Sequence, residues 1–89
     1  MMDPNTPWEL HPSVSVRSEP FGALVYHFGT RKLSFLKDLK LVVLVNALAT
    51  SETVEDALII AEIPTDERAR YTAALDTLAR SQTIRARAA

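Results

Sequence analysis

Cysteine is absent from this chain of 89 residues. Without thiols the chain can form no disulfide, no thiolate zinc site, no iron–sulfur cluster and no cysteine nucleophile. Glycine occurs only at positions 22 and 29, which excludes a glycine-rich loop that cradles phosphate groups. We therefore expect the protein to carry no cofactor.

Catalytic and metal-binding patterns are also lacking. The two histidines, His11 and His27, have no second histidine or carboxylate three or four residues away. A helical metal site needs that spacing, so both are predicted to be ordinary surface histidines. No spacing typical of serine hydrolases, zinc proteases or dinucleotide-binding folds occurs. The sequence therefore predicts a protein that is not an enzyme.

Long apolar runs and a charge excess are missing as well. The longest apolar run, residues 41–45, is far short of the roughly 20 residues that span a bilayer. The stretch "MMDPNTPWEL" has neither the basic nor the apolar region of a secretory signal. The formal net charge is −1, whereas nucleic-acid binders usually carry a basic excess on one face. We expect a cytoplasmic protein with no membrane or nucleic-acid partner.

Three strands are predicted in the first half of the chain. Residues 13–19, "SVSVRSE", alternate valine with polar residues, which is typical of a half-buried strand. Residues 23–28 and 31–36 flank Gly29 and Thr30 as the two arms of a hairpin. A two-residue loop would pair Tyr26 with Leu33, and a four-residue loop would pair it with Arg31.

Both registers give the same division of the hairpin into two faces, because they differ by two residues. The more apolar face is predicted to meet the core, and the mixed face to be partly in water. The apolar face holds Leu24, Tyr26, Leu33 and Phe35, and the mixed face holds Ala23, Val25, Lys32, Ser34 and Leu36.

Three helices are predicted to follow the strands. The run "LVVLV" could be a buried strand, but its apolar pattern continues through residues 46–49 and favours a helix from Asp38. A second helix over residues 53–62 begins with Thr53 at capping-box spacing from Asp56. Pro64 ends it. Thr65 is predicted to cap a third helix that fades near residue 81 and buries Tyr71, Ala74, Leu75 and Leu78.

These elements predict a small α+β domain that is winged-helix-like, with a three-stranded antiparallel sheet followed by three helices. Residues 1–12 contain three of the five prolines and are expected to be irregular, with Trp8 and Leu10 as docking anchors. The domain proper is expected to cover residues 13–85, with Ile84 tucked back. Residues 85–89, "RARAA", are expected to fray, and the tail outside the domain is 86–89.

Three binding roles remain open on this reading. The second and third helices resemble a helix-turn-helix, but the third carries three arginines against three carboxylates, which argues against DNA binding. The third strand, "RKLSFL", has charges only at its turn end, so an extended peptide could add to its edge. The same edge could instead be covered by the third helix, or pair with a second copy in a homodimer.

The run "HPSVSVRSEPFGALVYHFGTRKLSFL", followed by a short apolar helix, resembles the MftB family, the peptide chaperones of mycofactocin biosynthesis. The most specific part is "RSEPFGALVYHFGTRKLSFL", and the resemblance covers roughly residues 8–85. A more distant likeness, carried by "LVYHFGTRKL" and the three helices, is to the PqqD-like chaperones of PQQ biosynthesis.

The resemblance implies a RiPP recognition element, a domain that binds the leader of a ribosomally made precursor peptide. In that family the leader adds as a strand to the third strand, beside the third helix, and is handed to a radical S-adenosylmethionine (SAM) maturase. Carried over to this chain, the strand side of the groove is Arg31, Lys32, Leu33, Ser34, Phe35 and Leu36. The helix side is Arg68, Tyr71, Thr72, Leu75, Asp76 and Ala79, of which Tyr71 and Leu75 could instead belong to the core.

Overall fold

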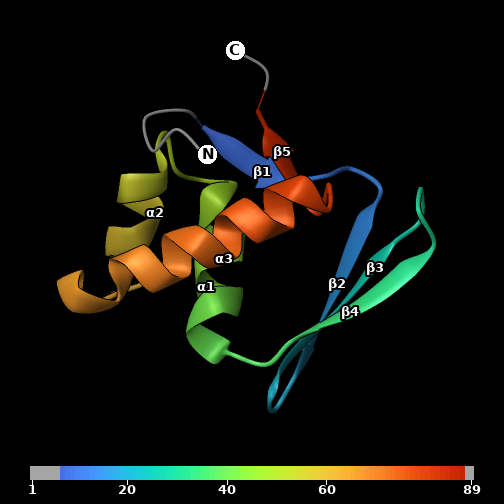
Figure 1. Ribbon diagram of the computed structural model, residues 1–89, viewed down its shortest axis with the longest axis horizontal. Helices are drawn as coiled ribbons and strands as arrows, with labels where there is room; N and C mark the ends of the chain where they lie inside the picture. The colour runs from blue at the N-terminus through green and yellow to red at the C-terminus, as the bar shows by residue number, and fades with distance from the viewer. Residues whose placement is uncertain (1–6, 88–89) are drawn as a thin grey trace.

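The computed structural model describes residues 7–87, which form two small antiparallel sheets and three α-helices (Figure 1). The strands are β1 (Trp8–Leu10), β2 (Val14–Glu19), β3 (Gly22–His27), β4 (Lys32–Leu36) and β5 (Ile84–Ala86). The helices are α1 (Leu39–Leu48), α2 (Val54–Ile60) and α3 (Arg68–Arg80), with a 3₁₀ turn η1 (Thr65–Glu67) before α3. The order β2-β3-β4 followed by three helices confirms the predicted α+β, winged-helix-like class.

The hairpin register is the one expected from the shorter loop. Tyr26 pairs with Leu33 and Leu24 pairs with Phe35, and the ladder closes at His27 and Lys32. The connecting residues 28–31 include Arg31 in a left-handed conformation.

The prediction of which hairpin face meets the core is wrong. Ala23 and Val25 are buried against the helices, whereas the side chains of Leu33 and Phe35 are 59% and 54% exposed. The small residues of β3 let α1 approach the sheet closely, and α1 packs directly on β3. Size complementarity therefore outweighed total hydrophobicity, and the larger side chains lie on the outer face.

His27 also differs from its prediction, because it is buried rather than on the surface. Its Nδ1 accepts hydrogen bonds from the backbone N–H groups of Gly29 (3.0 Å) and Thr30 (3.2 Å). The imidazole thus holds the turn of the hairpin in shape.

Two helix starts follow from capping. The carboxylate of Asp38 accepts from the backbone N–H groups of Lys40 and Leu41, and the hydroxyl of Thr53 accepts from Asp56. The predicted cap at Thr65 is wrong: this residue lies in η1, and no side chain caps either η1 or α3. The run "LVVLV" is helical, as expected.

The helices end without glycine. After α2, the N–H of Ile63 donates to the carbonyl of Leu58 and the N–H of Glu62 to that of Ile59. This is a Schellman motif, which requires a left-handed residue at Glu62, and the φ of Glu62 is 57°. The end of α3 repeats the motif with Gln82, whose φ is 63°.

The ends of the described chain form a second sheet that the sequence did not predict. β1 pairs with β5, with Trp8 opposite Ala86 and Leu10 opposite Ile84 (Figure 1). Residues 8–10 are therefore regular rather than irregular, and residues 85 and 86 belong to a strand rather than a frayed tail. The parts of these two predictions that concern residues 1–6 and 88–89 lie outside the described residues. Trp8 and Leu10 pack against the core, as expected, and Ile84 is fully buried.

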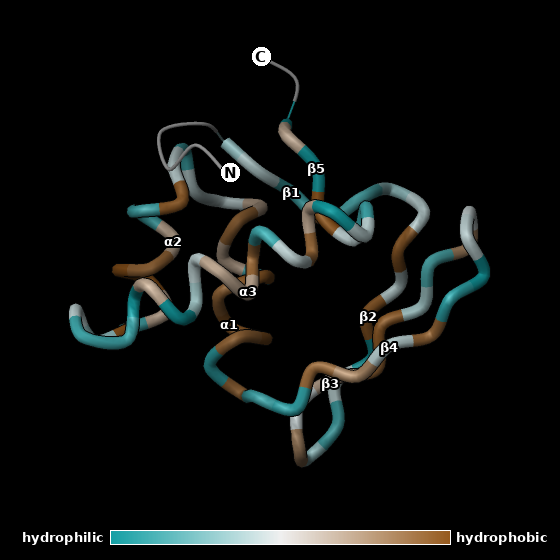
Figure 2. Tube along the Cα trace, viewed as in Figure 1, coloured by the Kyte–Doolittle hydropathy of each residue, from teal (hydrophilic) through white to brown (hydrophobic). Residues whose placement is uncertain are grey.

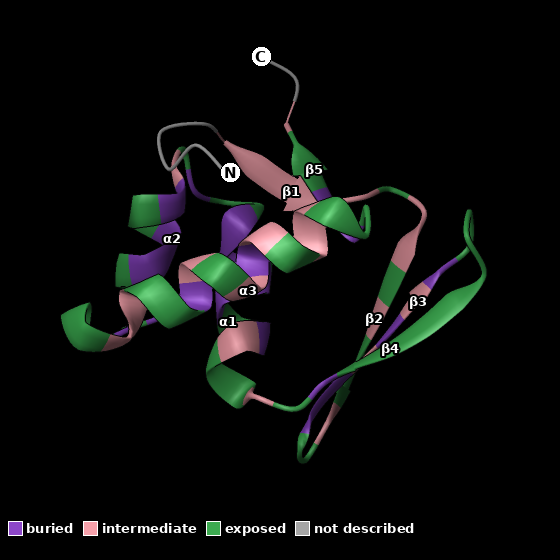
Figure 3. Ribbon diagram, in the orientation of Figure 1, coloured by how far each residue is buried: buried purple, intermediate pink, exposed green. Residues whose placement is uncertain are grey.

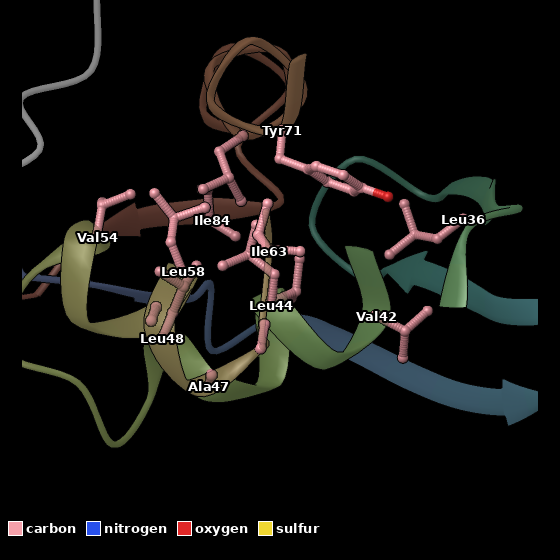
Figure 4. Close-up of a cluster of buried hydrophobic side chains, with 14 of the residues drawn as sticks. Leu36, Val42, Leu44, Ala47, Leu48, Val54, Leu58, Ile63, Tyr71 and Ile84 are labelled. Carbon is pink, nitrogen blue, oxygen red and sulfur yellow. The ribbon is translucent and has the colours of Figure 1, made fainter. Parts of the chain in front are cut away.

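One core joins these elements. Its largest fully buried side chains are Leu44, Leu48, Leu75, Ile84, Val45 and Val54, which come from all three helices and β5. Figure 4 shows this cluster, with Leu36 at its sheet end, and Figure 2 shows hydrophobic stretches along α1 and α2.

Candidate functional site: the free edge of β4

The outer edge of β4 is the candidate site. Among residues 7–87, β4 is hydrogen-bonded to β3 alone, so it forms one edge of the three-stranded sheet. Figure 3 shows that β4 is exposed along most of its length. It contains no proline, and its one charged residue, Lys32, lies at its start.

The backbone groups that face this edge can be assigned. The N–H of Arg31 donates to the carbonyl of His27 at 2.6 Å, so that carbonyl points toward β4. Polar backbone groups alternate between the two sides of an antiparallel strand, so His27 and Lys32 form a hydrogen-bonded pair. Along β4 the backbone N–H and C=O groups of Leu33 and Phe35 therefore point away from β3, toward the free edge.

The two faces of β4 differ in character. Leu33 and Phe35 stand on the outer face, where the ring of Phe35 lies 6.1 Å from that of Phe21. Lys32, Ser34 and Leu36 share the helix-facing side, and only Leu36 is buried there. The helical layer therefore covers the end of β4 and leaves the helix-facing side open at Ser34.

Tyr71 joins α3 to the end of this strand. Its side chain points from α3 toward Leu36 (Figure 4), and its hydroxyl donates a 2.6 Å hydrogen bond to Asp38. The guanidinium of Arg70 lies 4.8 Å from the centre of the Tyr71 ring. The carboxylate of Glu67 forms ion pairs with both Arg70 (2.6 Å) and Lys40 of α1 (3.3 Å). These contacts fix α3 beside the junction of β4 and α1.

The hydrogen bond between Tyr71 and Asp38 shifts the pKa values of both side chains. Desolvation raises the pKa of Asp38, but the hydrogen bonds from Tyr71, Leu41 and Lys40, with the charge of Arg70, outweigh it and leave the pKa lowered. The bond to Asp38, followed by burial, raises the pKa of Tyr71. The pair is therefore an ionised carboxylate and a neutral phenol over a wide pH range.

The other residues expected on the helix side lie differently. Leu75 has no exposed surface and belongs to the core. Arg68 donates to the carbonyl of Ile63, beyond the end of α2, at 3.5 Å. Asp76 forms an ion pair with Arg80 at 3.1 Å. Thr72 and Ala79 are partly buried. The structure thus brings Tyr71, of the six, into contact with the residues that follow β4.

Sequence reasoning missed Asp38, Glu67 and Arg70 as parts of this site. Asp38 was identified only as the start of a helix, and its bond to Tyr71 spans 33 positions. No local pattern signals a contact between residues so far apart.

Within residues 7–87, no group of three or more His, Cys, Asp or Glu side chains is placed to hold a metal ion. No helix in that range has the length and apolar character needed to cross a membrane.

Comparison with known proteins identifies relatives over nearly the whole chain. The chain is 50% identical to the peptide chaperone MftB of Mycolicibacterium smegmatis, over 92% of this chain and 80% of that protein. It is 49% and 46% identical to the proteins of the same name from Mycobacterium ulcerans and Mycobacterium tuberculosis, over 92% of this chain and 75% of each. No solved structure matches the chain.

These relatives are all named as peptide chaperones, a non-catalytic role. The sequence model of the same family matches residues 7–85, which include both β1 and most of β5. On this match and these identities, the chain belongs to the peptide chaperone MftB family.

Proposed function

We propose that this chain is a peptide chaperone of mycofactocin biosynthesis. It binds the leader of a ribosomally made precursor peptide as an added strand on the free edge of β4, and presents it to a radical SAM maturase. The observation that supports strand addition most directly is the pair of outward-facing backbone sites at Leu33 and Phe35. An extended peptide gains affinity from such groups and register from the neighbouring side chains.

The opposite edge of the sheet is less suited to a peptide. On β2, Arg17 and Glu19 form an ion pair at 3.1 Å, and the N–H of Val14 is already bonded to the carbonyl of His11. Charged side chains are a common means of blunting an edge strand. On β4, by contrast, residues 33–36 are uncharged, which favours this edge.

The position of α3 supports a groove rather than a bare edge. Tyr71 is held at the closed end of the strand by Asp38, while Ser34 remains open further along. Tyr71 is itself buried in the core, so a peptide on β4 would meet α3 at the exposed Arg70, and we assign the helix side of the site to Arg70, supported from behind by Tyr71. Arg68, Thr72, Asp76 and Ala79 remain predictions for the outer part of the same helix.

Peptide titration with a matched pair of variants tests strand addition. The probe is a labelled leader segment of a mycofactocin precursor peptide, and the readout is the backbone amide NMR spectrum. Leu33→Pro removes an N–H that faces the free edge and leaves the β3–β4 ladder intact. Leu33→Ala keeps that N–H and shortens the side chain.

Wild type should show saturable shifts in residues 31–37 and at Arg70. Leu33→Pro should show no binding at about 50 μM peptide, a concentration at which weak binding is still measurable. Leu33→Ala should bind more strongly than Leu33→Pro. Circular dichroism checks that both variants fold. Equal binding by a folded Leu33→Pro, or shifts confined to β2, would rule out addition at β4.

The maturase step has its own test. Purified radical SAM maturase is given the precursor peptide with wild-type chain, with Leu33→Pro, or with neither. If maturation of the precursor requires the wild-type chain and is weaker with Leu33→Pro, the result supports presentation of the peptide to the maturase. Equal turnover in all three reactions would show that the enzyme captures its peptide unaided.

A further inference from the structure

We infer that the segment bound at the β4 edge is an acidic peptide with two apolar residues, two positions apart, that face away from the helices. This inference rests on the proposed function, and it specifies the chemistry of the peptide that the edge selects.

The apolar spacing follows from the parity of strand pairing. Residues directly opposite each other on neighbouring strands place their side chains on the same face of the sheet. Guest residues opposite Leu33 and Phe35 therefore lie on the outer face, whichever way the guest runs. There they meet two side chains that are more than half exposed, beside the ring of Phe21. Apolar guest residues would shield this surface from water.

The guest residue between these two points the other way. It lies beside Ser34, on the side of β4 that faces the helices. Ser34 is exposed and offers a hydroxyl rather than an apolar surface. The apolar requirement thus falls on alternate guest positions, both of them on the outer face.

The charge requirement follows from the residues that flank the edge. Arg31 and Lys32 lie at one end of β4 and Lys37 follows the other, while residues 28–37 contain no Asp or Glu. Within residues 7–87, none of these three cations takes part in an ion pair. Opposite charges across neighbouring strands are favourable, so acidic residues on either side of the apolar pair fit this edge.

A second copy of the chain fits the same edge poorly. Antiparallel pairing of β4 with itself, with Leu33 opposite Phe35, would place Arg31 of each copy opposite Lys37 of the other. Like charges directly opposite each other destabilise a strand pair. In this register the charge pattern therefore favours an acidic peptide over a homodimer.

Selection from a displayed library of random twelve-residue peptides tests the inference without assuming a natural ligand. Binders to the wild-type protein are counter-selected on Leu33→Pro, so that edge-dependent peptides remain. The recovered peptides should be enriched in pairs of apolar residues two positions apart, with Asp or Glu on the flanks. Their binding should weaken as the salt concentration rises.

The side-chain contribution is then measured on one selected peptide. The double variant Leu33→Thr with Phe35→Thr keeps strand-forming residues and both amides, and should bind about tenfold more weakly. Arg31→Gln with Lys37→Gln should bind more weakly and with less salt dependence. Ile59→Thr, an equivalent change at an exposed residue of α2, is the matched control and should bind as wild type does.

The outcomes separate the two proposals. Peptides that lose binding on Leu33→Pro but show neither pattern, and bind the double variants normally, would overturn the inference and leave strand addition standing. Selected peptides that bind Leu33→Pro as well as wild type would overturn both. Sedimentation could instead show a dimer that dissociates only when peptide binds. A second copy of the chain, rather than an acidic peptide, would then occupy the β4 edge of the peptide-free protein.

Discussion

The hydroxyl of Tyr71 in α3 donates a 2.6 Å hydrogen bond to the carboxylate of Asp38, the residue that caps α1. One carboxyl group therefore serves two helices: one oxygen caps α1 and the other receives Tyr71. Because Asp38 follows β4 by two residues, the contact also sets the distance between the candidate edge and α3.

Replacing Tyr71 by phenylalanine should lower the free energy of unfolding by about 1–2 kcal/mol at pH 7, because a hydrogen bond to a charged group is lost. The lowered pKa of Asp38 means that its contribution is present above the ordinary value of 3.8 and is lost as the pH falls through the folded pKa. Urea unfolding should show a difference between wild type and Tyr71→Phe that shrinks from pH 7 to pH 3. Tyr26→Phe, at the other tyrosine, is the control, and an equal loss there would refute the assignment.

Gly22 should tolerate no side chain. Its φ is 151°, and an added Cβ would lie 1.8 Å from the carbonyl oxygen of Leu36, a backbone atom. Gly22→Ala should therefore cost on the order of 3 kcal/mol in thermal or urea unfolding. At Gly29 the nearest atom to an added Cβ is Cε1 of the His27 side chain, at 2.9 Å, and the loss should be smaller. A variant Gly22→Ala as stable as Gly29→Ala would contradict the close approach.

Glu62→Gly should stabilise the chain by about 0.5–1 kcal/mol. Glu62 occupies the left-handed position of the Schellman motif after α2, where a Cβ is unfavourable and glycine is preferred. Ala61→Gly, one residue earlier in a right-handed conformation, is the matched control and should destabilise. Chemical unfolding of both variants checks the sign, and stabilisation by both would point to a general effect of glycine.

Ile84→Ala should cost about 3 kcal/mol, because the side chain is fully buried in the core. Its neighbour Arg85 is exposed and forms an ion pair with Glu9 at 2.8 Å. Arg85→Ala should cost less than about 1 kcal/mol, as expected of a surface ion pair. If Ile84→Ala were as mild as Arg85→Ala, this end of the chain would be dispensable to the fold.

The central sheet and the helices were predictable because their patterns are long and local. The alternation around Gly29 restricted the hairpin to two registers with the same faces, and one of them is observed. The choice of face failed because Leu33 and Phe35 are larger apolar residues than Ala23 and Val25, and sequence hydrophobicity alone cannot show which apolar face of a hairpin is exposed. The strands "WEL" and "IRA" are too short for any period to be visible.

The candidate site was predictable only in part. The strand was predicted as 31–36 and observed as Lys32–Leu36, because Arg31 adopts a left-handed conformation in the turn. The direction of its free amides depends on the observed register. The helix side was placed from resemblance, and its one observed link to the strand end, Tyr71 to Asp38, joins residues 33 positions apart.

The pairing of β1 with β5 has a consequence for how the chain folds. Trp8 and Ala86 are neighbours in space although 78 positions separate them along the chain. Closing a loop of this length is entropically costly and slows folding relative to local hairpins. The β3–β4 hairpin can form as soon as residues 22–36 have left the ribosome, whereas Ile84 completes the core only after nearly the whole described chain has emerged. The nascent protein therefore exposes its apolar edge before it has a finished core to support it.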